Sequence, residues 1–203
     1  MTPNIFLEII TLFISYLLGS IPSGLLVSRY YKLPDPRQTG SHTIGATNIL
    51  RLGNKGAAFL TLFLDALKGS IAVIFSLIFA PSLALFAGIL AIVGHIWPIW
   101  LKFQGGKGVS TAFGVILIFN WPLAIICLMT WIMMATITRY SSLASLVTVL
   151  LSPLYVVFLT DIDLVIPCLT IALLLVWTHR ENIARLTKGK EPKIGNSNIA
   201  NPS

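Results

Sequence analysis

The sequence predicts an all-α integral membrane protein with seven transmembrane helices, its amino terminus outside, its carboxyl terminus in the cytoplasm and its fourth helix short. Of its 203 residues, 56% are hydrophobic and only 10% are charged, and the mean hydropathy is +0.87. An ordinary soluble domain carries about 25% charged residues. The composition therefore excludes a soluble domain. It also excludes a disordered chain, which needs low hydrophobicity and high net charge.

Apolar stretches supply the seven spans, since a helix that crosses ~30 Å of hydrocarbon needs ~20 mostly apolar residues. The first basic residue, Arg29, lies beyond the first stretch, so we expect that stretch to stay as a membrane helix and not to be a signal peptide. The stretches cover residues 4 to 27, 57 to 80, 82 to 101, 108 to 119, 122 to 138, 142 to 160 and 164 to 178.

The fourth stretch is too short to cross the membrane as a regular helix. Its 12 residues rise only ~18 Å. It is therefore extended through the glycine-rich loop before it, or it is a re-entrant half-helix that lines a cavity.

The fourth and fifth stretches form either a hairpin or one long helix, because residues 108 to 138 carry no charge and are interrupted only by Asn120, Trp121 and Pro122. The placement of basic residues decides, since short cytoplasmic loops collect lysine and arginine. With a hairpin, thirteen of the 14 basic residues fall on one side, and the remaining one, Lys68, lies inside the second stretch. The thirteen lie in loops 28 to 56, 102 to 107 and 139 to 141 and after residue 178. We therefore predict the hairpin.

We expect one domain. Residues 1 to 190 form a single polytopic transmembrane domain, and residues 191 to 203 form a flexible cytoplasmic tail, because the last dozen residues, PKIGNSNIANPS, are typical of a disordered end.

Polar residues gather in segments that share the predicted cytoplasmic face. In the first segment, Ser41, Thr43 and Asn48 offer neutral hydrogen-bonding groups, and Arg51 offers a planar guanidinium that suits phosphate. Asn48 and Arg51 are three residues apart and would share a helix face. The alternative is a capped loop whose arginine only marks the membrane boundary. The segments cover residues 39 to 57, 94 to 114 and 179 to 186.

The second segment has a glycine-rich pattern around one lysine. Gly105, Gly106 and Gly108 surround Lys107 directly before an apolar helix. Backbone N–H groups, a helix amino terminus and an ammonium can converge there on an anion such as phosphate. A nucleotide P-loop is excluded, because it needs Ser or Thr directly after its lysine. The alternative is a flexible turn with a boundary lysine.

Several other polar residues are candidates for the site, and some of them allow two interpretations. His179 and Asn182 are three residues apart and can point together into the bundle. Asp65 and Lys68 lie inside a span, where a lone charge costs ~2.5–3.5 kcal/mol. They are either a structural ion pair or part of the site wall, with Lys68 as a second cation. His95 is either an interfacial anchor or a functional residue.

These groups describe a site for one or two phosphate groups near the cytoplasmic membrane surface, which favours phospholipid chemistry. The histidine-x4-aspartate pattern of many acyltransferases is absent, and so is the HExxH metal motif. Cys127 and Cys168 lie in apolar stretches without metal-ligand spacing, so we expect no metal site. The alternative function is a membrane transporter for a small phosphate-bearing or organic anion, but the sequence has no visible inverted repeat.

Five motifs resemble, in order, those of the bacterial acyl-phosphate:glycerol-3-phosphate 1-O-acyltransferase family. The resemblance implies a seven-helix enzyme of the bacterial inner membrane whose active site faces the cytoplasm. It implies transfer of the acyl group of an acyl phosphate to the sn-1 hydroxyl of glycerol 3-phosphate, giving lysophosphatidate and inorganic phosphate in the first acylation of phospholipid synthesis. The motifs are GSIPSG at 19 to 24, GATNILR at 45 to 51, LDALKG at 64 to 69, GHIWPIWLKFQGGKGVSTAFG at 94 to 114 and HRENIARL at 179 to 186.

The resemblance and the polar pattern together give the predicted site. The resemblance implies site positions at Ser41, Arg51, Lys107, His179 and Asn182, with Gly105 and Gly106 in the phosphate-binding loop. The predicted catalytic residues are Ser41, Lys107, His179 and Asn182. The predicted substrate-binding residues are Thr43, Asn48, Arg51, Lys68, Gly105 and Gly106.

One departure and several expectations complete the prediction. The family reads S-G-N-x-G-x-x-N-x-x-R, whereas this chain has His42 and Thr43 in place of the glycine and asparagine. No cofactor and no nucleic acid are expected. The partners are acyl phosphate, glycerol 3-phosphate and membrane lipid, and the chain acts as a monomer. Two groups are candidates for the general base: His179 and the phosphate of the acyl donor.

Overall fold

The computed structural model describes residues 4–159 and 162–195, and these residues form helices and connecting loops without any strand. Short 3-10 helices stand at Pro81–Leu83, Ile99–Leu101 and Ile162–Leu164. The α-helices are α1 (Ile5–Ser20), α2 (Ser23–Tyr30), α3 (Ala46–Arg51), α4 (Lys55–Phe79), α5 (Ala84–Ile96), α6 (Val109–Phe119), α7 (Trp121–Thr138), α8 (Ser141–Leu159), α9 (Val165–Thr178) and α10 (Arg180–Thr187).

Several of these helices are long and apolar enough to cross a membrane. By length and composition, the described residues contain 5 such helices, or 6 if Ile162–Thr178 and Arg180–Thr187, bent by 62°, count as one span. Helix α6 is apolar but has only 11 residues, as predicted for the fourth stretch. The prediction of an all-helical membrane protein is confirmed. The count of seven spans and their orientation remain predictions.

The predicted hairpin between the fourth and fifth stretches is confirmed. Helix α6 ends at Phe119, and Asn120 adopts an extended conformation with φ −154° and ψ 91°. The side-chain Oδ1 of Asn120 accepts a hydrogen bond of 2.9 Å from the N–H of Leu123. Pro122 stands in the first turn of α7, where its missing N–H costs nothing. Asn120 therefore ends one helix and caps the next.

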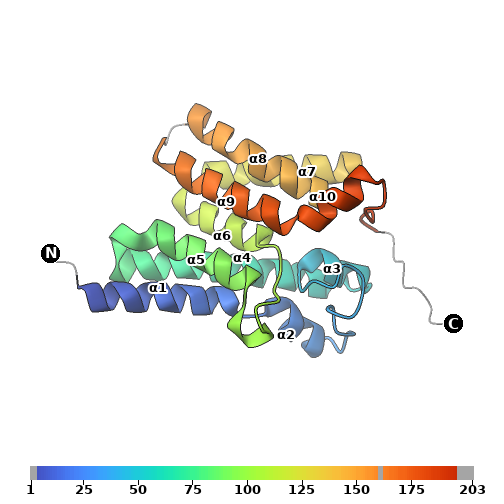
Figure 1. Cartoon of the computed structure of the whole chain (residues 1–203), viewed down its shortest axis with the longest axis horizontal. Helices are drawn as coiled ribbons and strands as arrows, with labels where there is room; N and C mark the ends of the chain where they lie inside the picture. Colours follow the sequence, from blue (N-terminus) through green and yellow to red (C-terminus); the bar gives the residue numbers. More distant parts are fainter. Residues whose placement is uncertain (1–3, 160–161, 196–203) are drawn as a thin grey trace.

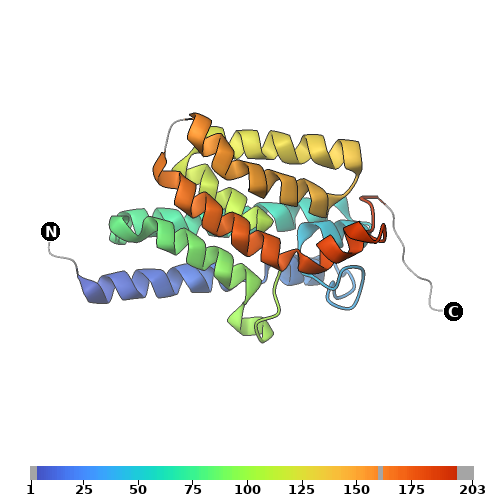
Figure 2. The ribbon, with the colours of Figure 1, turned by 45° about the horizontal axis from the view of Figure 1, so that its top comes forward.

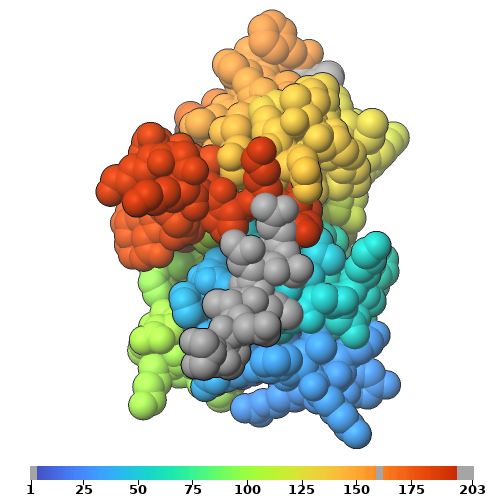
Figure 3. All heavy atoms as spheres, turned by 90° about the vertical axis from the view of Figure 1, so that its right-hand side faces the viewer, coloured from blue at the N-terminus to red at the C-terminus, as the bar shows by residue number. Residues whose placement is uncertain are grey.

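The helices run roughly along one axis, and α3, the loop before it and α10 lie at one end. In Figure 1, α1 begins at the left end, whereas α3 and α10 lie at the right end. Helix α1 packs against α4 and α5, α4 packs against α6, and α8 packs between α7 and α9. The turned view in Figure 2 keeps α7 and α8 side by side. Figure 3 views the right-hand end, where α10, the segment after it, the loop before α3 and the start of α4 meet.

Large apolar side chains cover the outside of the bundle. Phe6 is 72% exposed on α1, Phe59 71% on α4, Phe158 83% on α8 and Leu173 73% on α9. So much exposed apolar surface is unfavourable in water and marks a surface for another apolar medium. The outer face therefore matches a lipid environment.

Glycines bring α4 and α6 into close contact. A Cβ on Gly69 would lie 2.4 Å from the main-chain O of Thr111, and a Cβ on Gly114 would lie 1.9 Å from the main-chain O of Ala66. The Oγ of Ser70 also donates a 2.8 Å hydrogen bond to the main-chain O of Gly114. Small residues at helix crossings let backbones approach in this way in membrane proteins. This contact fixes α6, and with it the glycine-rich loop that precedes α6.

We expect Gly114→Ala to lower the unfolding temperature of the purified protein, because the added methyl group must push α4 and α6 apart. Overpacking of this kind costs about 1–3 kcal/mol. Gly56→Ala is the matched control, since its Cβ would meet nothing closer than 3.5 Å. Thermal unfolding in detergent measures both variants. Equal melting temperatures for the two would contradict the described contact.

Candidate active site

A cavity of about 330 Å³ opens among α3–α10, where α5 contributes His95, and residues of all three polar segments line it. The loops, α3 and α10 supply its polar lining. The helices α6, α7 and α9 supply mainly apolar lining, including Phe113, Ile116, Leu128 and Ile171. Hydroxyl groups of α8 stand among the apolar residues. The polar lining from the predicted site comprises Ser41, Thr43, Asn48, Arg51, Lys107, His179 and Asn182.

Asn48 holds the loop before α3 in place. Its side chain is 1% exposed, and its Oδ1 accepts a 2.9 Å hydrogen bond from the N–H of Ser41. Its Nδ2 donates to the main-chain O of Pro36 at 2.6 Å, Thr39 at 3.1 Å and Thr43 at 2.8 Å. The amide of Asn48 is therefore occupied by the loop itself, although Asn48 also lines the cavity, and its role in substrate binding stays a prediction.

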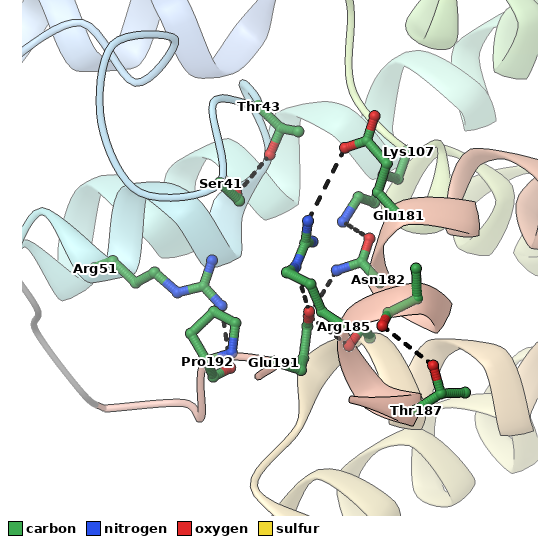
Figure 4. Close-up of polar contacts among 12 residues, drawn as sticks. Ser41, Thr43, Arg51, Lys107, Glu181, Asn182, Arg185, Thr187, Glu191 and Pro192 are labelled. Carbon is green, nitrogen blue, oxygen red and sulfur yellow. Dashed lines mark hydrogen bonds and ion pairs between the residues drawn. The ribbon is translucent and has the colours of Figure 1, made fainter. Parts of the chain in front are cut away.

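The rest of this loop presents hydroxyl groups to the cavity. The Oγ of Ser41 lies 3.0 Å from the Oγ1 of Thr43, as Figure 4 shows. His42 is exposed with φ +55°, and its Nδ1 lies 3.0 Å from the main-chain O of Arg37. His42 therefore faces its own loop, and Thr43 takes the cavity-facing place.

Arg51 projects from the end of α3 towards the segment that follows α10 (Figure 4). Its Nη2 donates a 3.4 Å hydrogen bond to the main-chain O of Pro192. Its Nε is buried without a hydrogen-bond partner among the described residues. The guanidinium therefore has capacity left for an anionic ligand in the cavity.

The glycine-rich loop is shaped by its own backbone. The N–H of Gly105 donates to the main-chain O of Ile96 at 3.1 Å, and the N–H of Gly106 donates to the main-chain O of His95 at 3.0 Å. These two N–H groups are thus used inside the fold, and the predicted role of the two glycines in phosphate binding stays a prediction. Gly108 adopts φ +88° as the residue before α6, a conformation that favours glycine.

Lys107 is the group that this loop presents to the cavity. Its Nζ donates a hydrogen bond to the Oδ1 of Asn182 (Figure 4), and its main-chain O accepts a 3.1 Å hydrogen bond from the Oγ1 of Thr178. Burial lowers the pKa of Lys107 to about 8, and the nearby guanidinium groups of Arg185 and Arg51 act in the same direction against the opposing charge of Glu191. An anion beside Lys107 would relieve this cost.

His179 and Asn182 lie at the start of α10, and both line the cavity. The Nδ1 of His179 donates a 2.7 Å hydrogen bond to the main-chain O of Leu175, so the free Nε2 is the unprotonated nitrogen. Burial, together with the charge of Lys107, lowers the pKa of His179 to about 4. The imidazole is therefore neutral near pH 7.

Glu191 is a site residue that the sequence reasoning missed. Its Oε1 accepts hydrogen bonds from the Nδ2 of Asn182 at 2.6 Å and the Oγ of Ser142 at 2.7 Å, and its Oε2 accepts one from the Nε of Arg185 at 2.8 Å (Figure 4). Burial raises the pKa of the Glu191 carboxyl, but these three hydrogen bonds outweigh burial and hold the pKa below its usual value. The only available signal was one acidic residue within a lysine-rich run.

The chain thus stays packed beyond residue 190. Glu191 is 7% exposed, and the N–H of Ile194 donates a 2.7 Å hydrogen bond to the main-chain O of Arg139. The flexible tail predicted from residue 191 therefore stays a prediction only for residues 196–203, which lie outside the described residues.

Lys68 is taken out of the predicted site. Its Nζ lies 2.9 Å from the Oδ1 of Asp65 and donates a 2.7 Å hydrogen bond to the main-chain O of Ile21. It does not belong to the cavity lining, whereas Asp65 does. The structure therefore has the ion pair, and Lys68 is not the second cation of the site.

The described residues contain no group of three or more His, Cys, Asp or Glu side chains that could hold a metal ion. Cys127 and Cys168 are buried free thiols.

Comparison with known proteins assigns the family. A family model described as glycerol-3-phosphate acyltransferase matches residues 9–189. The chain belongs to this glycerol-3-phosphate acyltransferase family. It is 50% identical over 184 residues to the glycerol-3-phosphate acyltransferase of Methylococcus capsulatus, covering 89% of this chain and 93% of the relative. It is 46% identical over 189 residues to that of Coxiella burnetii, covering 92% and 97%.

Two solved structures share the acyltransferase fold. Both are of PlsY (YgiH), described as an integral membrane glycerol 3-phosphate acyltransferase, one in a glycerol 3-phosphate form and one in a lysophosphatidic acid form. The first superposes with a TM-score of 0.85 at 33% identity and covers 92% of this chain and 95% of that chain. The second gives a TM-score of 0.83 at 32% identity and covers 91% and 94%.

We expect Glu191→Ala to destabilise this family member strongly, because it leaves the amide of Asn182 and the hydroxyl of Ser142 without their buried acceptor. Leaving a buried donor without its acceptor costs about 1–3 kcal/mol. Glu181→Ala is the control, since Glu181 is 75% exposed and lies 4.0 Å from Arg185. Thermal unfolding of the purified variants tests this. A Glu191→Ala protein as stable as Glu181→Ala would show that the carboxylate is dispensable.

Proposed function

We propose that this protein transfers the acyl group of an acyl phosphate to the sn-1 hydroxyl of glycerol 3-phosphate, giving lysophosphatidate and inorganic phosphate. The observation that carries the proposal is the cavity, which joins a cationic end at Lys107 and Arg51 to an apolar wall from the spans. A lysophosphatidate has the same division into a phosphate head and one acyl chain. The PlsY relatives with glycerol 3-phosphate and lysophosphatidic acid support this assignment.

The reaction requires two anions to be held together at the polar end. An acyl phosphate is already activated, so the main tasks are to position both substrates and to stabilise the tetrahedral oxyanion and the departing phosphate. Lys107 and Arg51 supply positive charge, and Ser41, Thr43 and Asn182 supply polar groups that orient the glycerol hydroxyls. In the balanced step the new ester C–O bond forms, the acyl C–O bond to phosphate breaks, and the hydroxyl proton leaves.

We assign that proton to the departing phosphate. His179 has a pKa of about 4, so it is neutral at pH 7 but a weak base. The departing group is inorganic phosphate, whose second pKa lies above the value of roughly 6 for a phosphate monoester, so it is the stronger base. The Nε2 of His179 then orients a hydroxyl and does not carry the proton away.

The proposal includes seven spans, an outside amino terminus and an active site that faces the cytoplasm of a bacterial inner membrane. The thirteen basic residues outside the spans support it. So does the arrangement in Figure 1, where α3 and α10 lie at the end opposite to the start of α1.

We expect single cysteines at Lys55 and Lys188 to react only with a reagent that has entered the cytoplasm, and a cysteine at Asn120 to react from outside. Labelling in intact cells and in inside-out vesicles, in a background without Cys127 and Cys168, measures this. Asn120 and Lys188 labelled from the same face would refute the seven-span topology.

We expect acyl phosphate to support turnover by purified protein with no added metal and with chelator present. The described site has cations and no metal-ligand cluster, so charge stabilisation comes from side chains. Formation of lysophosphatidate from labelled glycerol 3-phosphate is measured, with acyl-CoA as the comparison donor. Loss of activity on chelation, or efficient use of acyl-CoA, would refute the proposal.

We expect Lys107→Ala to lower kcat/KM by ~10²–10³, the usual effect of losing one preorganised charge contact. Because the pKa of Lys107 is about 8, wild-type kcat/KM should fall as pH rises through about 8, where the free enzyme loses the ammonium proton. Lys107→Arg stays charged, so its kcat/KM should not fall as the pH rises through about 8. Its activity should nevertheless be low, because the guanidinium differs in shape from the ammonium. A wild-type profile that stays flat to pH 10 would remove Lys107 from phosphate binding.

A further inference from the structure

Three ionisable residues are buried directly behind the glycine-rich loop, and the proposed reaction does not use them. Asp65 is 2% exposed, Lys68 5% and His95 4%. The Oδ1 of Asp65 lies 2.9 Å from the Nζ of Lys68 and 3.4 Å from the Nδ1 of His95. Charged groups this deep in an apolar bundle are expensive, so each must be held by a partner.

Asp65 joins three parts of the fold through these contacts. Lys68 lies one turn further along α4 and donates a 2.7 Å hydrogen bond to the main-chain O of Ile21, at the break between α1 and α2. His95 lies in the last turn of α5. The carboxylate of Asp65 therefore stands between a fixed ammonium and the imidazole. Its Oδ1 and the Nδ1 of His95 are close but do not form a hydrogen bond, so the contact between them is one of charge and packing.

The imidazole of His95 packs directly against Gly106. A Cβ on Gly106 would lie 2.1 Å from the Nε2 of His95 and 2.9 Å from its Cε1. The main-chain O of His95 also accepts the 3.0 Å hydrogen bond from the N–H of Gly106. Gly106 is thus held by both the backbone and the ring of one residue, and the next residue in the chain is Lys107.

We propose that Asp65, Lys68 and His95 are positioning residues that set the place of the glycine-rich loop and so of the Lys107 ammonium. The carboxylate of Asp65 lies against one edge of the imidazole, the opposite edge packs against Gly106, and Gly106 fixes where Lys107 meets phosphate. This inference rests on the proposed function to the extent that Lys107 is taken as a phosphate ligand. It assigns a role to the LDALKG motif, of which Asp65 lines the cavity and Lys68 does not.

Gly105 offers a matched comparison within the same loop. A Cβ on Gly105 would lie 2.1 Å from the main-chain O of His95 and 2.5 Å from the Cδ of Pro98. Removing the imidazole of His95 relieves the clash at Gly106 but leaves the clash at Gly105. A comparison of alanine variants at the two glycines therefore distinguishes an effect of the His95 ring from a general effect of loop distortion.

The test is a pair of double-mutant cycles on the full-length protein in detergent. His95→Ala is combined with Gly106→Ala in one cycle and with Gly105→Ala in the other. Turnover with both phosphorylated substrates gives kcat and KM, and competition with inorganic phosphate gives a dissociation constant that needs no acyl transfer. Residues that act through one contact are non-additive in such a cycle.

We expect each single variant to raise the KM of at least one phosphorylated substrate and the Kd of phosphate by about tenfold to a hundredfold, since displacing a binding group by about 1 Å costs on the order of 10². The His95→Ala, Gly106→Ala double variant should be no worse than the worse single variant. The effects of His95→Ala and Gly105→Ala should multiply. Multiplication in both cycles would overturn the proposal.

Asp65→Asn tests the contact between the carboxylate of Asp65 and the imidazole of His95. It should raise the KM of a phosphorylated substrate and the Kd of phosphate, with kcat changed less than KM. Asp163→Asn, the same substitution at an exposed position, should change none of these constants. If the Asp65→Asn variant does not accumulate in the membrane, a double variant with Asp65→Asn and Lys68→Met is used. It replaces both members of the ion pair with neutral side chains. Constants equal to wild type in that double variant would overturn the proposal.

Three further outcomes test the positioning role and the proposed function separately. A shift in the pH profile of kcat in His95→Gln would make His95 a proton carrier and overturn its positioning role. A wild-type protein that binds phosphate but transfers no acyl group would refute the proposed function while the Kd cycles still decide the positioning role. A wild-type protein that does neither would refute both.

Discussion

The geometry of the site depends on one chain of hydrogen bonds that runs from Lys107 through Asn182 to Glu191. It joins the glycine-rich loop, the start of α10 and the segment after α10. A buried ammonium and a buried carboxylate are each costly alone, and an amide between them satisfies both because it offers an acceptor on one side and donors on the other. The chain of bonds therefore keeps a cation inside an apolar bundle and leaves part of its charge available to a substrate.

The membrane explains why the loop has its particular backbone. Irregular backbone at the edge of a bilayer must satisfy its N–H groups within the protein. Gly105 and Gly106 do so by donating to carbonyl groups at the end of α5, which leaves no room for side chains between the two segments. The same close contact allows α6 to begin deep in the bundle and to remain short. Shape and polar satisfaction, more than direct substrate contact, thus account for these two glycines.

The sequence predicted those parts of the structure whose cause is local. Apolar stretches and the Asn120–Pro122 break give the helices and the hairpin, since length, capping and missing N–H groups act within a few residues. The basic side chains of the site were also predictable, because Lys107 and Arg51 stand in marked polar segments. The role of Asn48 was not, since its amide could bind either a substrate or its own loop until the path of residues 36–43 was known.

The remaining errors concern contacts between residues far apart in sequence. Lys107 and Asn182 are 75 residues apart, and Ser142 and Glu191 are 49 apart, so no periodic pattern connects them. Glu191 lies among lysines in a polar end, and only the folded chain shows that this end returns to the cavity. The sequence left Lys68 either paired with Asp65 or acting as a second site cation, because the helix period does not show that its ammonium turns to Ile21.

The most direct test of the account is an experimental structure of the protein with glycerol 3-phosphate and a non-hydrolysable acyl phosphate analogue. We expect one phosphate within hydrogen-bond distance of the Lys107 Nζ and the other substrate's phosphate beside Arg51, with the acyl chain along α6 and α7 and the glycerol hydroxyl facing the acyl carbon. Substrates bound outside this cavity, or an Lys107 side chain that touches neither phosphate, would contradict it.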